Sequence, residues 1–240
     1  TLKPVATELG GKDAAYVRAD ADIDFTIPNL VEGACYNAGQ SCCAIERVYV
    51  HRSLYAKVVD GVVEYARSLV IGDPLDESTT LGPIAQPHHP DALAALVASG
   101  IAAGGRLLVG GATAKVNGKG RFFAPTVVSD APQRSALMQE EAFGPIVALL
   151  PVDGDEQAIT LMNDSRFGLT ASVWTQDVAM ARALFPRIEA GTVFMNRCDF
   201  LDPLLPWSGV KETGRGVSLS HHGYSSMVRL KAAHFRTRER

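Results

Sequence analysis

The stretch IVALLPVDGDEQAITLMNDSRFGLTASVWTQDVAMARALFPRIEAGTVFMN, residues 146–196, determines the fold class. It alternates apolar, strand-like segments with segments whose apolar residues recur at helical spacing. This pattern predicts strands at 146–151, 169–175 and 192–196, separated by helices at 155–162 and 177–188. Apolar strands that alternate with helices are typical of a parallel sheet covered by helices. The sequence therefore predicts an α/β fold with a mainly parallel sheet.

The same alternation continues toward the N-terminus. Ile27, Leu30, Val31, Ala34 and Cys35 share one helical face, and Pro28 is expected in the first turn of that helix. Further helices are expected over 54–69 and 93–101, and strands over 47–51, 106–109 and 126–128. Residues 112–120 are interpreted as a surface loop and residues 226–232 as one more strand.

Composition excludes several classes of protein. The 240 residues carry 23 basic and 26 acidic side chains, a net charge of −3, which argues against nucleic-acid binding. No apolar run approaches the ~18 residues of a membrane span. Four cysteines are too few for a disulfide scaffold, so we expect a reducing, cytoplasmic setting. The sequence begins without Met or a signal peptide, and we expect it to be part of a longer chain.

Three segments contain residue types that could perform chemistry. Cys42 follows the Gly39-Gln40-Ser41 turn, which could expose a thiol that a helix would bury. Alternatively, Cys42 and its neighbour Cys43 are simply small buried residues. Glu8 precedes the paired glycines of Leu9-Gly10-Gly11, and Glu140-Glu141-Ala142-Phe143 combines two acids with an aromatic ring; each segment could equally be a surface loop. The pairs His88-His89 and His221-His222 are interpreted as solvated, so no metal is expected.

Taken together, these motifs resemble the aldehyde dehydrogenase family. Glu-Leu-Gly-Gly-Lys at 8–12 matches the family's general-base motif, and Gly-Gln-Ser-Cys at 39–42 matches its nucleophile motif, 34 residues further along. Other family motifs follow in family order, so the resemblance covers residues 2 to about 232. These further motifs lie at residues 72–74, 80–83, 123–127, 141–145, 163–170, 196 and 211–216.

The resemblance implies a role for each matching residue. Cys42 would be the nucleophile that forms a thiohemiacetal and then a thioester, and Glu8, expected to be partly desolvated, would activate the hydrolytic water. Glu141, Phe143, Leu9 and Gly10 would contact the nicotinamide end of NAD or NADP. The expected substrate-binding residues, which suit an apolar or aromatic aldehyde, are Trp207, Phe200 and Leu201.

The resemblance also implies how the chain is organised. Residues 1–12 would be the last strand and turn of a cofactor domain, residues 13–223 the catalytic domain, and residues 224–240 an oligomerisation strand and tail. Family members are usually much longer, so we expect this chain to be the C-terminal catalytic portion, inactive alone and part of a homo-oligomer. The family's Pro-Phe-Gly-Gly motif reads Pro206-Trp207-Ser208-Gly209, which leaves the identity of the aldehyde open.

Three other functions fit parts of the sequence. A CoA-acylating aldehyde dehydrogenase would transfer the acyl group to a thiol, but such enzymes typically lack the glutamate found here as Glu8. A non-catalytic fragment would retain only the oligomerisation strand. A thiol hydrolase would use Cys42 and Glu8 without a cofactor. Hydrolytic aldehyde oxidation with NAD or NADP is the favoured hypothesis. The sequence does not distinguish between the two cofactors.

Overall fold

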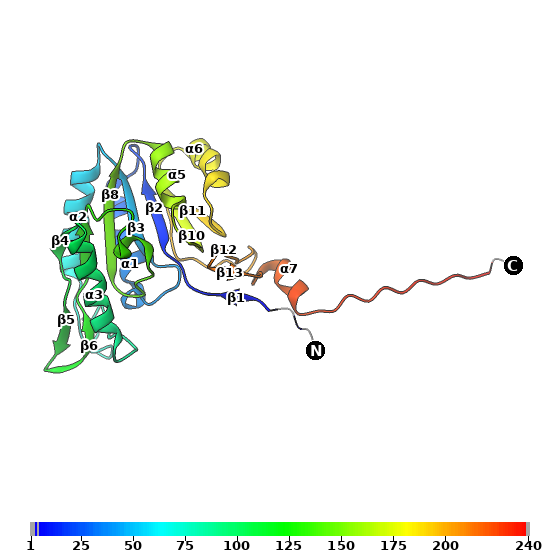
Figure 1. Cartoon of the computed structure of the whole chain (residues 1–240), viewed down its shortest axis with the longest axis horizontal. Coiled ribbons are helices and arrows are strands. Elements are labelled where there is room, and N and C mark those ends of the chain that lie inside the picture. Colours follow the sequence, from blue (N-terminus) through cyan, green and yellow to red (C-terminus); the bar gives the residue numbers. More distant parts are fainter. Residues whose placement is uncertain (1–2, 4, 239–240) are drawn as a thin grey trace.

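A computed structural model describes residue 3 and residues 5–238 of the chain. Its centre is a seven-stranded sheet (Figure 1). In spatial order the strands are β11 (Thr192–Met195), β10 (Thr170–Trp174), β2 (Asp13–Val17), β3 (Ile45–His51), β8 (Ile146–Val152), β7 (Thr126–Ser129) and β4 (Arg106–Val109). Every neighbouring pair is parallel except β4 with β7. The predicted mainly parallel α/β sheet is confirmed.

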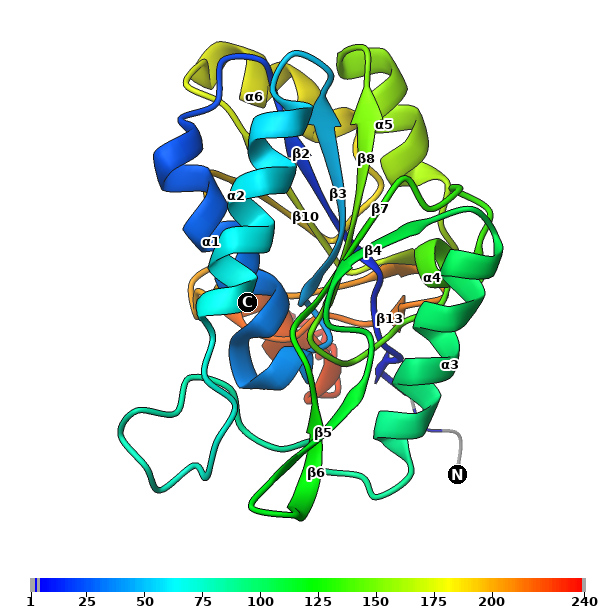
Figure 2. The same cartoon turned by 90° about the vertical axis from the view of Figure 1, so that its left-hand side faces the viewer.

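Helices cover both faces of the sheet. Figure 2 shows α1 (Ile23–Cys35) and α2 (Tyr55–Ser68) on one side, and α3 (His89–Ala102) and α5 (Asp155–Asn163) on the other. The shorter helices are α4 (Ala136–Gln139), α6 (Val178–Leu184) and α7 (Ser220–Gly223). In α2 the predicted apolar stripe is buried, with Val58, Val62 and Ala66 at most 3% exposed. Complete burial of such a valine contributes about 1.5–3 kcal/mol.

The first helix begins earlier than its apolar pattern indicated. Asp22 caps α1 by accepting a hydrogen bond from the Phe25 N–H at 3.2 Å, so Ile23 is the first helical residue. Pro28 consequently lies inside the helix, and the prediction that it occupies the first turn was wrong. An N-terminal aspartate cap is a stronger start signal than the proline.

Residues 112–120 are not a loop, as predicted, but most of a hairpin. Strands β5 (Thr113–Val116) and β6 (Lys119–Phe123) pair in antiparallel orientation. Asn117 and Gly118 connect them, with φ angles of 51° and 74°. Asn-Gly with two positive φ angles is the signature of a tight hairpin turn. The sequence contained this signal, and the prediction overlooked it.

Four short strands form the rim below the main sheet. β1 (Thr7–Glu8) pairs with β13 (Gly214–Arg215) in antiparallel orientation. β12 (Val210–Lys211) pairs with β9 (Phe167–Gly168). The rim therefore brings the segment that contains Glu8 next to a segment about 200 residues away in sequence.

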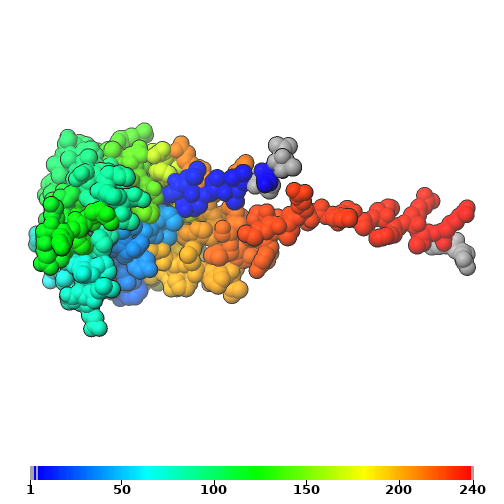
Figure 3. Space-filling view, turned by 90° about the horizontal axis from the view of Figure 1, so that it is seen from below, coloured from blue at the N-terminus to red at the C-terminus, as the bar shows by residue number. Residues whose placement is uncertain are grey.

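The chain ends in an extended tail. Residues 227–238 contain neither helix nor strand, and they run away from the rest of the molecule (Figures 1 and 3). The predicted strand over 226–232 is therefore absent from the single chain. A strand needs a neighbouring strand to pair with, and residues 228–238 pair with none of the described strands. Among the described helices, none has both the length and the apolar character that spanning a bilayer requires.

Candidate active site

The three predicted motifs meet at one edge of the sheet. Gly11 lies just before β2, Cys42 just before β3, and Glu141 just before β8. Because these strands are adjacent and parallel, their amino ends lie at the same edge. The fold thus brings together residues that are more than 100 positions apart in sequence.

Close contacts show how tightly these segments pack. The Gly11 N–H donates a hydrogen bond of 3.0 Å to Oε1 of Glu141. A Cβ atom on Gly11 would lie 2.4 Å from the Cys42 carbonyl oxygen, and one on Gly10 would lie 2.5 Å from Oε2 of Glu141. Any side chain would force the segments apart, so this turn requires glycine at both positions.

A strained loop presents Cys42 to solvent. After α1, residues Asn37, Ala38 and Gly39 adopt left-handed backbone conformations with φ of 51°, 55° and 70°. The Gln40 side chain anchors the loop, donating to the carbonyl oxygen of Pro83 at 3.2 Å and accepting from the Ala85 N–H at 2.8 Å. Cys42 is partly exposed, whereas Cys43 is 4% exposed.

The two adjacent thiols differ in their electrostatics. The Cys43 thiol and the backbone N–H of Cys42 lower the pKa of Cys42, against the opposing effects of burial and of the Glu8 and Glu141 carboxylates. The Cys43 pKa is raised by Cys42, by burial and by Asp199, whose Oδ1 accepts from the Cys43 Sγ at 2.8 Å. At neutral pH, Cys42 is therefore the more reactive of the two.

This difference predicts selective labelling. We expect iodoacetamide at neutral pH to modify Cys42 first, because a lower pKa gives a larger thiolate fraction. Burial raises the pKa of Cys35 and of Cys198 to about 12, so both should react slowly. Peptide mass spectrometry over a time course measures all four rates. Labelling of Cys198 as fast as Cys42 would contradict the prediction.

Glu8 is near enough to Cys42 for its carboxylate to raise the thiol pKa, but it is more open than expected. Its Oε1 accepts the Gly10 N–H at 3.0 Å, and its strand β1 pairs with β13 at the rim. The side chain is exposed, so the prediction that Glu8 is desolvated was wrong for the described chain.

Glu141 lies against the Gly10-Gly11 turn, and Phe143 follows it in the segment before β8. Burial raises the pKa of Glu141, and its carboxylate keeps free acceptor capacity beyond the bond from Gly11. Phe143 is 37% exposed and Leu9 is 63% exposed. A carboxylate flanked by exposed apolar side chains fits a flat ring with an attached ribose diol, as in the nicotinamide half of a dinucleotide.

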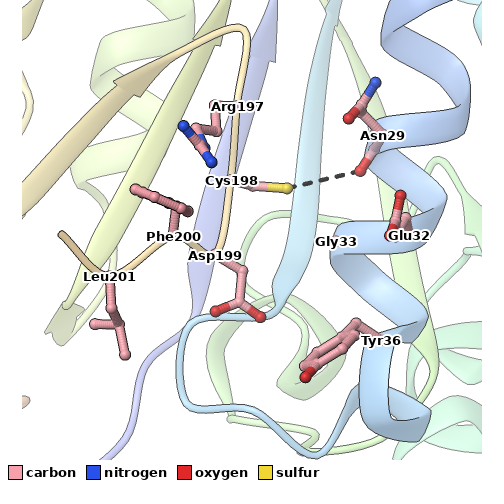
Figure 4. Close-up of a pocket in the computed structure, with 9 residues that line it drawn as sticks. All are labelled: Asn29, Glu32, Gly33, Tyr36, Arg197, Cys198, Asp199, Phe200 and Leu201. Carbon is pink, nitrogen blue, oxygen red and sulfur yellow. Dashed lines mark hydrogen bonds between the residues drawn. The ribbon is translucent and has the colours of Figure 1, made fainter.

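The predicted substrate residues do not all meet. Phe200 and Leu201 line a cavity of about 480 Å³ between α1 and residues 197–201 (Figure 4). Trp207 lies outside this cavity, in a bridge with Ser218. The cavity also contains the charged side chains of Glu32 and Arg197, so its wall is less apolar than predicted.

Sequence reasoning missed a cluster of buried charges beneath the site. Lys12, Asp13, Glu46 and Arg47 are each at most 3% exposed. Lys12 pairs with Glu46, Asp13 accepts from the Thr170 N–H at 3.0 Å, and Arg47 donates to the Lys12 carbonyl oxygen at 2.8 Å. The available signal was the position of these charges at the start of apolar strands, since buried charges are rare unless paired.

A partly exposed thiol of lowered pKa is typical of enzymes that use a cysteine nucleophile. The model of the aldehyde dehydrogenase family matches residues 1–233, and the chain belongs to this family.

Similar proteins agree with this assignment. The chain is 37% identical to succinate-semialdehyde dehydrogenase [NADP(+)] 1 of Mycobacterium ulcerans, over 96% of this chain and 50% of that protein. It is also 37% identical to betaine aldehyde dehydrogenase of Brucella anthropi, over 95% of this chain and 48% of that protein. The chain thus spans about half the length of the curated relatives it matches.

Solved structures share the fold. The NAD-dependent aldehyde dehydrogenase of Sinorhizobium meliloti superposes with a TM-score of 0.91 at 33% identity, over 94% of this chain and 45% of that one. Betaine aldehyde dehydrogenase of Staphylococcus aureus in complex with NAD+ gives a TM-score of 0.89 at 30% identity, over 92% and 44%.

Proposed function

We propose that this chain is the C-terminal catalytic portion of an aldehyde dehydrogenase that oxidises an aldehyde to a carboxylic acid with NAD or NADP. The observation that carries the proposal is the convergence of Cys42, Glu8 and Glu141 at one edge of the sheet. Family membership supports it, as do the names of the relatives, which act on succinate semialdehyde and betaine aldehyde. A cytoplasmic setting is part of the proposal and is supported by four free cysteines.

The first step is attack of the Cys42 thiolate on the aldehyde carbon. The sulfur forms a bond to carbon, the carbonyl becomes an oxyanion, and a thiohemiacetal results. The backbone N–H of Cys42 stabilises negative charge at this position, because it already lowers the pKa of the thiol. The anchored loop fixes that N–H before the substrate arrives.

The cofactor is held by the residues around the glycine turn. When bound, the nicotinamide supplies the acceptor for the hydride that the thiohemiacetal releases. Glu141 would accept hydrogen bonds from the ribose hydroxyls, and Leu9, Gly10 and Phe143 would lie against the ring. Their exposure and spacing around the glycine turn support these roles.

Hydrolysis of the thioester is the last step. Glu8 takes a proton from a water molecule, the resulting hydroxide adds to the thioester carbon, and Cys42 leaves as a thiolate. The exposed Glu8 side chain has access to water, and its bond to Gly10 keeps it near the thiol.

Binding measurements on the 240-residue chain test whether it has the reactive thiol without the main contacts for the dinucleotide. Dinucleotides gain much of their binding energy from a glycine-rich turn before a helix N-terminus. Here Gly104-Gly105 lie between α3 and β4, and Gly110-Gly111 lie between β4 and β5, so neither pair precedes a helix. We expect calorimetry to detect no binding of NAD or NADP by this chain alone, although Cys42 is alkylated normally. Tight binding of either dinucleotide would contradict this.

A role for the tail in self-association is a further part of the proposal. Met227 is 85% exposed, Val228 58% and Leu230 97%, in a segment that pairs with none of the described strands. Exposed extended segments of this kind tend to pair with another chain. We expect deletion of the residues after Gly223 to shift the intact protein to a smaller mass in light scattering. An unchanged mass would exclude the tail as the contact.

A further inference from the structure

A buried ion pair joins the segments of the site, and no proposed step uses it. Lys12 and Glu46 are 2% and 3% exposed and form a salt bridge with each other. Lys12 directly follows the Gly10-Gly11 turn, and Glu46 is the second residue of β3. Removing either partner would leave an uncompensated buried charge, so each depends on the other.

Glu46 has a second set of partners, in the turn before β8. Its Oε1 accepts the N–H groups of Ala142 and Phe143, each at 3.0 Å, and its Oε2 accepts the Ala142 N–H at 2.9 Å. Hydrogen bonds to an ionised carboxylate are stronger than those between neutral groups. Glu46 therefore holds the backbone of the turn that carries Glu141 and Phe143.

The conformation of this turn needs such support. Phe143 has a φ of 51°, a left-handed conformation that an aromatic residue rarely adopts. The side chain of Glu141 bonds in the opposite direction, to the Gly11 N–H at 3.0 Å. Two carboxylates thus link the glycine turn, β3 and the turn before β8 into one unit.

We propose, building on the proposed function, that Glu46 is a positioning residue that sets the shape of the Glu141–Phe143 turn to receive the nicotinamide end of the cofactor. Lys12 supplies the counter-charge that pairs with the buried Glu46 carboxylate. Glu141 in this turn raises the Cys42 pKa less than burial or Glu8 does, so cofactor binding and thiol reactivity can be separated by substitution.

The test compares three variants of the intact protein. Glu46→Gln removes the charge, and Lys12→Met with Glu46→Gln removes both charges, so that no buried cation is left unpaired. Glu156→Gln on α5 is the control, because it breaks an exposed ion pair with Arg187. We expect both Glu46 variants to raise the cofactor KM about tenfold. The aldehyde KM and the alkylation rate of Cys42 should change little, and the control should match the unsubstituted protein.

Amide hydrogen exchange supplies a readout that needs no cofactor. Exchange at Ala142 and Phe143 should be faster in both Glu46 variants and unchanged in the control. Unchanged exchange, or a cofactor KM restored in the double variant, would overturn the proposal. Equal losses in all kinetic constants and in the labelled fraction of Cys42 would indicate a purely structural role and also overturn it. If the unsubstituted protein oxidises no aldehyde, the proposed function fails, and exchange alone decides whether Glu46 holds the turn.

Discussion

Cys42→Ala is expected to abolish aldehyde oxidation by the intact protein, whereas Cys43→Ala should keep most of it. Removal of a covalent nucleophile lowers kcat by about 10⁴-fold or more, because no other group forms the intermediate. Cys42 is the partly exposed thiol with the lowered pKa. Cys43 is buried, and its Sγ donates to Asp199. Steady-state formation of reduced cofactor measures both variants.

A labelling control distinguishes chemistry from folding. Cys42→Ala should lose the fast-labelled thiol and keep its thermal unfolding midpoint, because the side chain is only partly buried. Cys43→Ala should keep Cys42 as a labelled thiol, at a reduced rate because the Cys43 thiol lowers the pKa of Cys42. Equal losses of activity in both variants, with both folded, would mean that the nucleophile is wrongly assigned.

Elements with regular apolar spacing were predictable, and the central strand β2 was not. The stripe of α2 and the apolar run of β8 carry their burial pattern in the sequence. The central strand β2 does not, because it begins with Asp13, whose partner Thr170 is distant in the chain. Its remaining small residues, Ala14 and Ala15, give little strand signal.

Site residues that belong to a short motif could be predicted from the sequence. Residues whose role depends on a contact with a distant segment could not. Cys42, Glu8 and Glu141 each belong to a short motif. The link from Glu46 to Ala142 joins residues 96 positions apart, and the local sequence does not show which distant group Glu46 contacts. The exposure of Glu8 is likewise a property of the rim, which only the pairing of β1 with β13 determines.

Glu8→Gln is expected to separate the two halves of the reaction. Glutamine keeps the shape of the side chain and its acceptor for the Gly10 N–H, but it cannot take a proton from water. Loss of a general base lowers turnover by roughly 10²–10⁴-fold. Attack by Cys42 and hydride release do not need that base, so one equivalent of reduced cofactor should still form rapidly.

The trapped intermediate gives the decisive measurement. After a single turnover, mass spectrometry of the intact Glu8→Gln protein should show the mass of the acyl group added to Cys42. Glu64→Gln, which removes an exposed carboxylate from α2, is the matched control and should show neither the added mass nor a slower turnover. Unimpaired turnover of Glu8→Gln would exclude Glu8 as the base. Loss of the initial burst as well would instead place Glu8 in the acylation step, where its nearby carboxylate already influences the pKa of Cys42.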